Sequence, residues 1–198
     1  MRSRSRRSAG PTASAALLIL AAALALAGCS GQDPVAAPTG ARVAPSTRPA
    51  TCAPGRARAA SADGLPRLQL DCLGRGGPVD VSHLAGPAIV NMWASWCYPC
   101  RQEMPLIQKA FIRHGAKVHF IGVDTKDSPD AARRFLSTVG ATYEQLSDPS
   151  GALAVDLHAP GLPMTVALGP GGAVVWRKAG LMSETDLAQA VAAAEGGG

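Results

Sequence analysis

Two cysteines separated by two residues follow an apolar run, and this feature constrains the fold more than any other. Ala88–Trp93 is nearly continuous in apolar residues, which is typical of a central strand covered on both faces. Cys97 and Cys100 come next, and apolar residues then recur at helical spacing as far as Arg113. The pair is therefore expected at a strand-to-helix junction, with Cys97 at the start of the helix and Cys100 about one turn in.

This position predicts a reactive thiol. Unpaired N–H groups and the dipole at a helix N-terminus favour negative charge, which lowers the pKa of the Cys97 thiol. Cys100 is close enough to attack a disulfide formed at Cys97, so we interpret the pair as a nucleophile and its resolving cysteine. A purely structural disulfide is the alternative. Zinc is disfavoured, because it needs four ligands and the sequence has no second pair at this spacing.

The rest of the chain alternates predicted strands and helices. We expect strands at 65–72, 79–81, 118–123, 164–168 and 173–176, and helices at 130–139, 151–157 and 184–194. This order predicts an α/β fold in which a central mixed sheet is flanked by helices and carries an N-terminal β extension. Asp124 and Lys126 are expected in a solvated loop.

The first thirty residues have the composition of an export signal. Four of the 19 Lys and Arg residues lie in the first ten positions, residues 13–27 are almost entirely apolar, and small residues precede Cys29. Leu26–Cys29 resembles the lipobox of bacterial lipoproteins, which implies cleavage after Gly28 and a lipid on Cys29. The alternatives are a stop-transfer helix and an ordinary secretory signal. We predict a signal peptide at 1–28 and a membrane anchor on the outer face of the cytoplasmic membrane.

Residues 29–62 are rich in Pro, Ala, Gly, Ser and Thr, which predicts a flexible linker before a folded domain at 63–198. The 15 basic residues after the signal are balanced by 14 acidic ones, so the chain lacks the basic surface that nucleic-acid binding requires. We expect a monomer with no nucleic-acid partner.

Cys52 and Cys72 are the two cysteines that remain after Cys29, Cys97 and Cys100 are assigned. In an oxidising compartment, an even number of remaining cysteines favours a structural disulfide, which would fasten the end of the linker to the domain. Two free thiols, or a second redox-active pair, are the alternatives.

The segment Trp93–Pro105, with the sequence Trp-Ala-Ser-Trp-Cys-Tyr-Pro-Cys-Arg-Gln-Glu-Met-Pro, closely resembles the active-site segment of TlpA/ResA-type thiol–disulfide oxidoreductases. The resemblance extends over residues 65–194. It implies a thioredoxin-like fold, location outside the cytoplasm, attack by Cys97 and resolution by Cys100. It also implies reduction of disulfides in exported proteins such as apocytochromes c or copper-site proteins. The chemistry requires no cofactor or metal, and a membrane thiol electron donor must re-reduce the pair.

The same resemblance assigns substrate contacts. Gly161–Thr165 is similar to the family's loop with a cis-proline, so Leu162 and Pro163 are expected to face the cysteines and pair with an extended substrate chain. Trp96, Tyr98 and Pro99, beside or between the cysteines, are the other expected contacts.

Glu103 matches a glutamate that lies near the active site in this family. It is one helical turn beyond Cys100, and a partly desolvated carboxyl there would titrate high and exchange protons with Cys100. The alternative is an exposed glutamate in the first turn. Asn91 stands where cytoplasmic thioredoxins carry a buried aspartate, and an amide cannot shuttle protons, which leaves more of this work for Glu103.

Three other functions remain open. The protein could form disulfides rather than reduce them, because spacing does not determine direction. It could be a copper metallochaperone that binds metal through Cys97, Cys100 and His158. A peroxidase is less favoured, because peroxidatic sites do not require this paired spacing.

Overall fold

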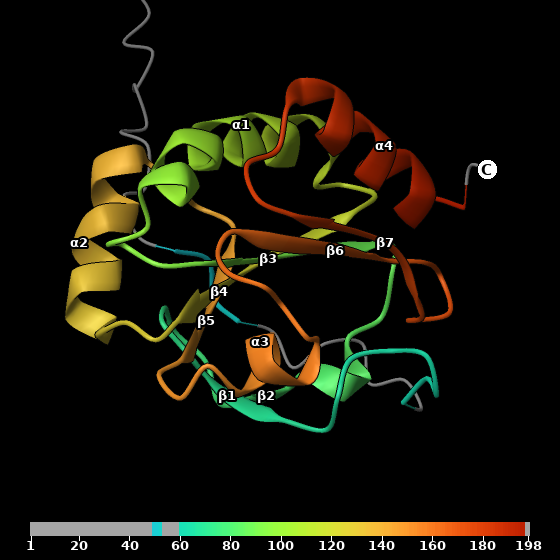
Figure 1. Ribbon diagram of the computed structural model, residues 1–198, viewed down its shortest axis with the longest axis horizontal. Coiled ribbons are helices and arrows are strands. Elements are labelled where there is room, and N and C mark those ends of the chain that lie inside the picture. Colours follow the sequence, from blue (N-terminus) through green and yellow to red (C-terminus); the bar gives the residue numbers. More distant parts are fainter. Residues whose placement is uncertain (1–48, 53–59, 197–198) are drawn as a thin grey trace, which may run out of the picture. The chain divides into compact units, whose positions relative to one another are not determined.

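A single seven-stranded sheet, in the order β2-β1-β5-β4-β3-β6-β7, organises the protein (Figure 1). The structure is a computed structural model that describes residues 49–52 and 60–196. These residues belong to one of the two units into which the chain divides, Arg42–Gly198.

The elements follow the predicted alternation of strands and helices. The strands are β1 (Gln69–Cys72), β2 (Val79–Asp80), β3 (Ala88–Trp93), β4 (His119–Thr125), β5 (Glu144–Asp148), β6 (Met164–Leu168) and β7 (Val174–Ala179). The helices are α1 (Tyr98–His114), α2 (Pro129–Val139), α3 (Ala152–Asp156) and α4 (Glu184–Ala194), with a short 3-10 helix at Val81–His83.

The sheet mixes parallel and antiparallel pairs, as predicted. Strands β3, β4 and β5 run parallel, which fits the helical crossovers α1 and α2 between them. Strand β6 is antiparallel to both β3 and β7, and the β1–β2 hairpin adds antiparallel strands beyond β5. This hairpin is the expected N-terminal β extension, and the α/β class is confirmed.

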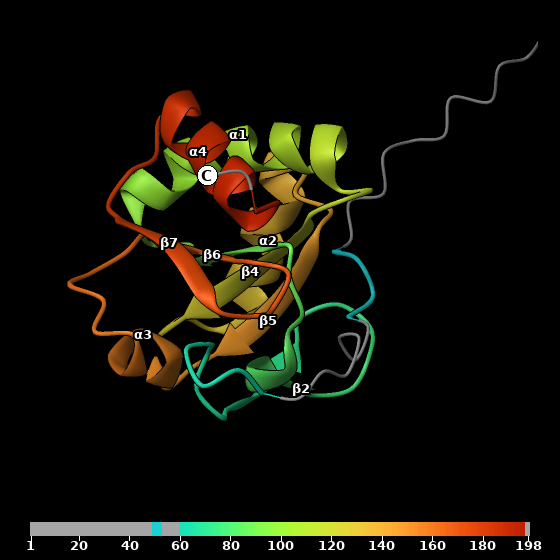
Figure 2. The same ribbon diagram turned by 90° about the vertical axis from the view of Figure 1, so that its right-hand side faces the viewer.

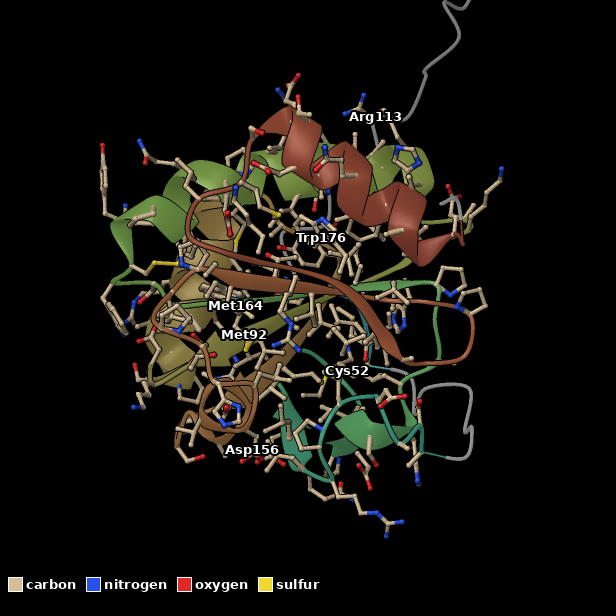
Figure 3. The ribbon with its side chains drawn as sticks, turned by 45° about the vertical axis from the view of Figure 1, so that its right-hand side comes forward. Cys52, Met92, Arg113, Asp156, Met164 and Trp176 are labelled. Atoms are coloured by element: carbon tan, nitrogen blue, oxygen red, sulfur yellow. A yellow bond between two sulfur atoms is a disulfide. The ribbon has the colours of Figure 1, made fainter. Side chains whose placement is uncertain are left out.

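Two apolar cores lie on opposite faces of the sheet. On one face, Ile89 and Trp93 of β3 pack beneath α1, α2 and α4. On the other, Val90 and Met92 pack with α3 and the N-terminal hairpin. The views in Figures 1 and 2 show α1 and α4 on one side of the sheet and α3 on the other. Met92 lies beside its partner Met164 on the second face (Figure 3).

Strand β5 departs from the expectations above, which include no strand at 144–148. Four of its five residues are polar, yet all five are buried. Strand β4 pairs with it on one side, and β1 pairs with Leu146 and Ser147 on the other. Backbone pairing and burial by neighbours therefore make this segment a strand, although its sequence lacks apolar alternation.

The end of the segment predicted as a linker is attached to the domain. The Ala50 N–H donates to the Thr142 carbonyl at 3.0 Å, and the Cys52 N–H donates to the Arg75 carbonyl at 2.7 Å. The predicted signal peptide, Cys29 and most of residues 29–62 lie outside the described residues. Within the described ranges, no helix has the length and apolar character needed to span a membrane.

Candidate active site

Cys97 and Cys100 are joined by a disulfide at the N-terminus of α1, with Sγ atoms 1.98 Å and Cα atoms 5.3 Å apart. Cys97 is the N-cap residue, and its Sγ accepts the Cys100 N–H at 3.3 Å. Pro99 follows within the first turn, where a missing N–H leaves no helical hydrogen bond unmade. The sulfur of Cys97 therefore lies where the helix backbone stabilises negative charge.

The two sulfurs differ in access. Cys97 is 4% exposed, whereas Cys100 is fully buried. The neighbouring side chains of Trp96 and Tyr98 are 61% and 71% exposed, an unusual amount for large aromatic groups. The Trp96 indole N–H donates to the Lys126 carbonyl at 3.0 Å, which fixes the indole beside the disulfide-bearing turn.

The loop before β6 reaches the same end of the sheet. Strand β6 pairs Met164 with Met92 of β3, so Pro163 lies at the end of β3 that leads into the cysteine turn. The Leu162–Pro163 bond is cis, Leu162 contacts both apolar cores, and Pro163 is buried. The Pro163 carbonyl accepts the Gly180 N–H at 2.8 Å, which ties this loop to the end of β7.

Glu103 lies on the buried face of α1, with only 1% of its surface exposed. Its Oε1 accepts the Asn91 side-chain N–H at 2.8 Å, and its Oε2 accepts the backbone N–H of Met182 at 3.0 Å. The Asn91 amide also donates to the Thr165 hydroxyl at 2.9 Å. The carboxyl group thus connects α1 to β3, to β6 through Asn91, and to the loop between β7 and α4.

This environment changes the acidity of Glu103. Burial raises its pKa to about 7, and the hydrogen bonds from Met182 and Asn91 oppose the rise by stabilising the anion. A carboxyl that titrates near neutrality can both accept and release protons, and it lies one turn from the buried Cys100. The contacts with Asn91, Thr165 and Met182 could not be read from the sequence pattern.

Asp124 corrects the expectation of a solvated loop. It lies near the end of β4 and is completely buried, although the neighbouring Lys126 is exposed. Its position next to the apolar run at 118–123 was the one sequence signal for burial. Asp127 lies close by in the sequence, and its Oδ2 accepts the Ser95 N–H at 2.6 Å. Ser95 precedes Cys97 by two residues.

Cys52 and Cys72 form a second disulfide, with Cα atoms 5.9 Å apart and a sequence separation of 20. Cys52 is 1% exposed and Cys72 is partly buried on β1.

In the described part of the chain, no three His, Cys, Asp or Glu side chains gather as metal ligands. The exposed His158 is therefore not grouped with Cys97 and Cys100 in a metal site.

Comparison with known proteins places this geometry in a family. The AhpC/TSA family matches residues 62–177. The thiol:disulfide interchange protein HelX of Rhodobacter capsulatus is 35% identical over 125 residues, which cover 60% of this chain and 68% of HelX. A DsbE homolog of Paracoccus denitrificans is 37% identical over 102 residues, or 51% of this chain, and only 55% of that relative's length is matched.

A solved structure shares the fold. A crystal structure described as a DsbE-type thiol:disulfide interchange protein of Chlorobium tepidum superimposes with a TM-score of 0.60 at 26% identity. The match covers 67% of this chain and 95% of that one. The predicted thioredoxin-like fold is confirmed. The chain belongs to the AhpC/TSA family, as a thioredoxin-like thiol–disulfide oxidoreductase.

Proposed function

We propose that this protein reduces disulfides in exported partner proteins while a lipid on Cys29 holds it at the outer face of the cytoplasmic membrane. The observation that carries the thiol–disulfide exchange chemistry is the asymmetry of the cysteine pair, and the resemblance to TlpA/ResA-type proteins favours the reductive direction. Cys97, whose sulfur caps α1, is 4% exposed, whereas Cys100 is fully buried one turn behind it. Such a pair can attack a partner through one sulfur and release it through the other.

The reaction begins with the reduced pair. The Cys97 thiolate attacks a partner disulfide, one S–S bond forms, the partner S–S bond breaks, and the leaving sulfur takes up a proton. Cys100 then loses its proton to the Glu103 carboxylate and attacks the Cys97 sulfur. The second partner thiolate leaves and is protonated. The partner gains two electrons and two protons, and Cys97–Cys100 becomes a disulfide that a membrane thiol donor must reduce.

The surface around Cys97 supports a protein partner. The exposed Trp96 and Tyr98 offer flat apolar area next to the reactive sulfur, and aromatic groups dominate the energetics of many protein interfaces. Leu162, on the loop before β6, is partly exposed at the same end of the sheet. The resemblance noted above points to the haem-binding cysteines of apocytochromes c or to copper-site cysteines as clients.

The Cys100→Ser variant tests this proposal. It should accumulate a covalent complex between Cys97 and its clients, which mass spectrometry of the captured proteins identifies, while the matched Cys97→Ser variant captures none. Absence of capture, together with unchanged insulin reduction in Cys97→Ser, would overturn the assignment. A Cys29→Ala variant that stays in the membrane fraction would contradict the lipid anchor.

The direction of electron flow has its own test. A reduction potential below about −200 mV would support a reductant, whereas one near −120 mV would indicate a disulfide-forming oxidant. Equilibration of Cys97–Cys100 with glutathione buffers measures this value.

A further inference from the structure

Asp124 is a buried carboxyl group beside the active-site segment, and the exchange chemistry described above does not use it. It is completely buried, and neither of its oxygens meets an N–H or O–H donor among the described residues. Its register partners are Trp93 of β3 and Ser147 of β5, so it faces the core beneath α1 and α2. An ionised carboxylate without donors is strongly disfavoured in such a place.

The groups around Asp124 supply negative charge. The pKa of Asp124 is raised to about 8: burial is the largest cause, followed by the charge of Asp127, a hydrogen bond to the Asp127 carboxyl and the charge of Asp148. A hydrogen bond between two carboxyl groups requires a proton on one of them. Near neutral pH, Asp124 is therefore the protonated member and donates to Asp127.

The other charged and titratable groups nearby are engaged elsewhere. The Asp148 oxygens accept hydrogen bonds from the backbone N–H groups of Gly151, Ala152 and Leu153 and from the Ser150 hydroxyl. Strand β3 contributes the indole of Trp93, which donates to Gln145 at 2.9 Å. The remaining cations point to other groups: the Lys126 side chain runs against Gly151, and the Arg101 guanidinium lies over Phe135.

Asp127 connects this pair to the reactive segment. Its Oδ2 accepts the Ser95 N–H at 2.6 Å, and its Oδ1 accepts the Ser128 N–H at 2.7 Å. One residue further on, the Trp96 indole donates to the Lys126 carbonyl. Two hydrogen bonds from the loop after β4 thus hold the two residues that precede Cys97.

We propose that Asp124 is a positioning residue for thiol–disulfide exchange: its protonated carboxyl donates to Asp127 and holds Asp127 where it accepts the Ser95 N–H. Loss of this proton replaces the hydrogen bond by repulsion between two carboxylates. The segment that carries Trp96 and Cys97 then loses its fixed placement at alkaline pH. The inference rests on exchange at Cys97 and holds for either direction of electron flow.

Nuclear magnetic resonance on the oxidised protein tests the proposal, because neither disulfide titrates. The Ser95 amide and Trp96 indole N–H resonances of the wild type should shift together, with a midpoint within about one pH unit of 8. In Asp124→Asn, the amide can still donate to Asp127, so both resonances should keep their neutral-pH positions up to pH 10. The matched control is Glu144→Gln, which removes a buried carboxyl from the first residue of β5. It should leave the midpoint unchanged.

Exchange rates give a functional readout. With a midpoint of about 8, roughly a tenth of Asp124 is protonated at pH 9. For each reduced protein, the rate of exchange with glutathione disulfide is measured at pH 7 and at pH 9. The pH 9 rate divided by the pH 7 rate should be up to about tenfold larger for Asp124→Asn than for the wild type.

Two outcomes would overturn the proposal: a wild-type Ser95 resonance that does not move between pH 6 and 10, or an Asp124→Asn variant with the wild-type midpoint. The first needs no variant, so the test stands even if Asp124→Asn does not fold. Failure of client capture by Cys100→Ser would instead count against the proposed function, and it leaves these resonances unaffected.

Discussion

Glu103 should make the protein less stable as the pH rises through neutrality. Burial raises its pKa from 4.5 to about 7, so the folded state keeps a proton that the unfolded chain has already released. Between about pH 5 and pH 7 the folded state binds more protons than the unfolded state, and the free energy of unfolding therefore falls with increasing pH. The loss is complete above the folded pKa.

The magnitude follows from the size of the shift. One pKa unit corresponds to about 1.36 kcal/mol, so the rise at Glu103 corresponds to about 3 kcal/mol. The Glu103→Gln variant keeps the shape of the side chain but cannot ionise. Relative to the wild type, its free energy of unfolding should increase by about 3 kcal/mol between pH 5 and pH 9.

Urea unfolding of the oxidised proteins at a series of pH values measures this difference. Subtracting the wild-type curve from that of the variant removes the contributions of all other titrating groups, Asp124 included. The control is Glu184→Gln, which removes an exposed glutamate and should give a difference that is nearly flat with pH. A change below about 1 kcal/mol for Glu103→Gln would refute the reasoning that the buried carboxyl titrates near neutrality.

Three shorter predictions concern the other contacts. Replacing both Cys52 and Cys72 by Ala should lower the free energy of unfolding by about 3 kcal/mol, measured in urea, because a closed loop of some twenty residues is lost. Trp96→Ala should change stability by less than about 1 kcal/mol but reduce kcat/KM for insulin reduction roughly tenfold, because its side chain is mostly exposed. Asn91→Ala removes a donor to Glu103 and should raise the pKa of that carboxyl above its wild-type value, as read from its ¹³C resonance; an unchanged value would contradict the role assigned to the amide.

The parts of the fold that could be predicted are those whose signals are local. Ala88–Trp93 carries its own apolar run, and α1 carries both a helical repeat and a cysteine pair, so both element types could be read directly. The strand has the predicted bounds, whereas α1 begins two residues before Cys100 and ends one residue after Arg113. Strand β5 has no such signal, because its polar residues are buried by pairing with β4 and β1. Its formation depends on neighbours that are distant in the sequence.

The site shows the same division. The position of Cys97 at a helix start follows from residues within one turn of it. The burial of Glu103 does not, because a glutamate in this part of a helix is equally suited to solvent. What buries it are contacts with Asn91, 12 residues earlier, and Met182, 79 residues later. The burial of Asp124 has a similar cause, since it depends on the strands on either side of β4 and on the core that packs over them.

The two edges of the sheet bear on how copies of this protein behave at high concentration. At one margin the outermost strand, β2, is only two residues long, and at the other β7 carries the consecutive cations Arg177 and Lys178. Short margins and charged margins both discourage a second molecule from extending the ladder of backbone hydrogen bonds. Strand β5, with five residues, would offer a longer template than β2, but β1 pairs with it at Leu146 and Ser147. This arrangement favours proteins that stay separate even at high local density.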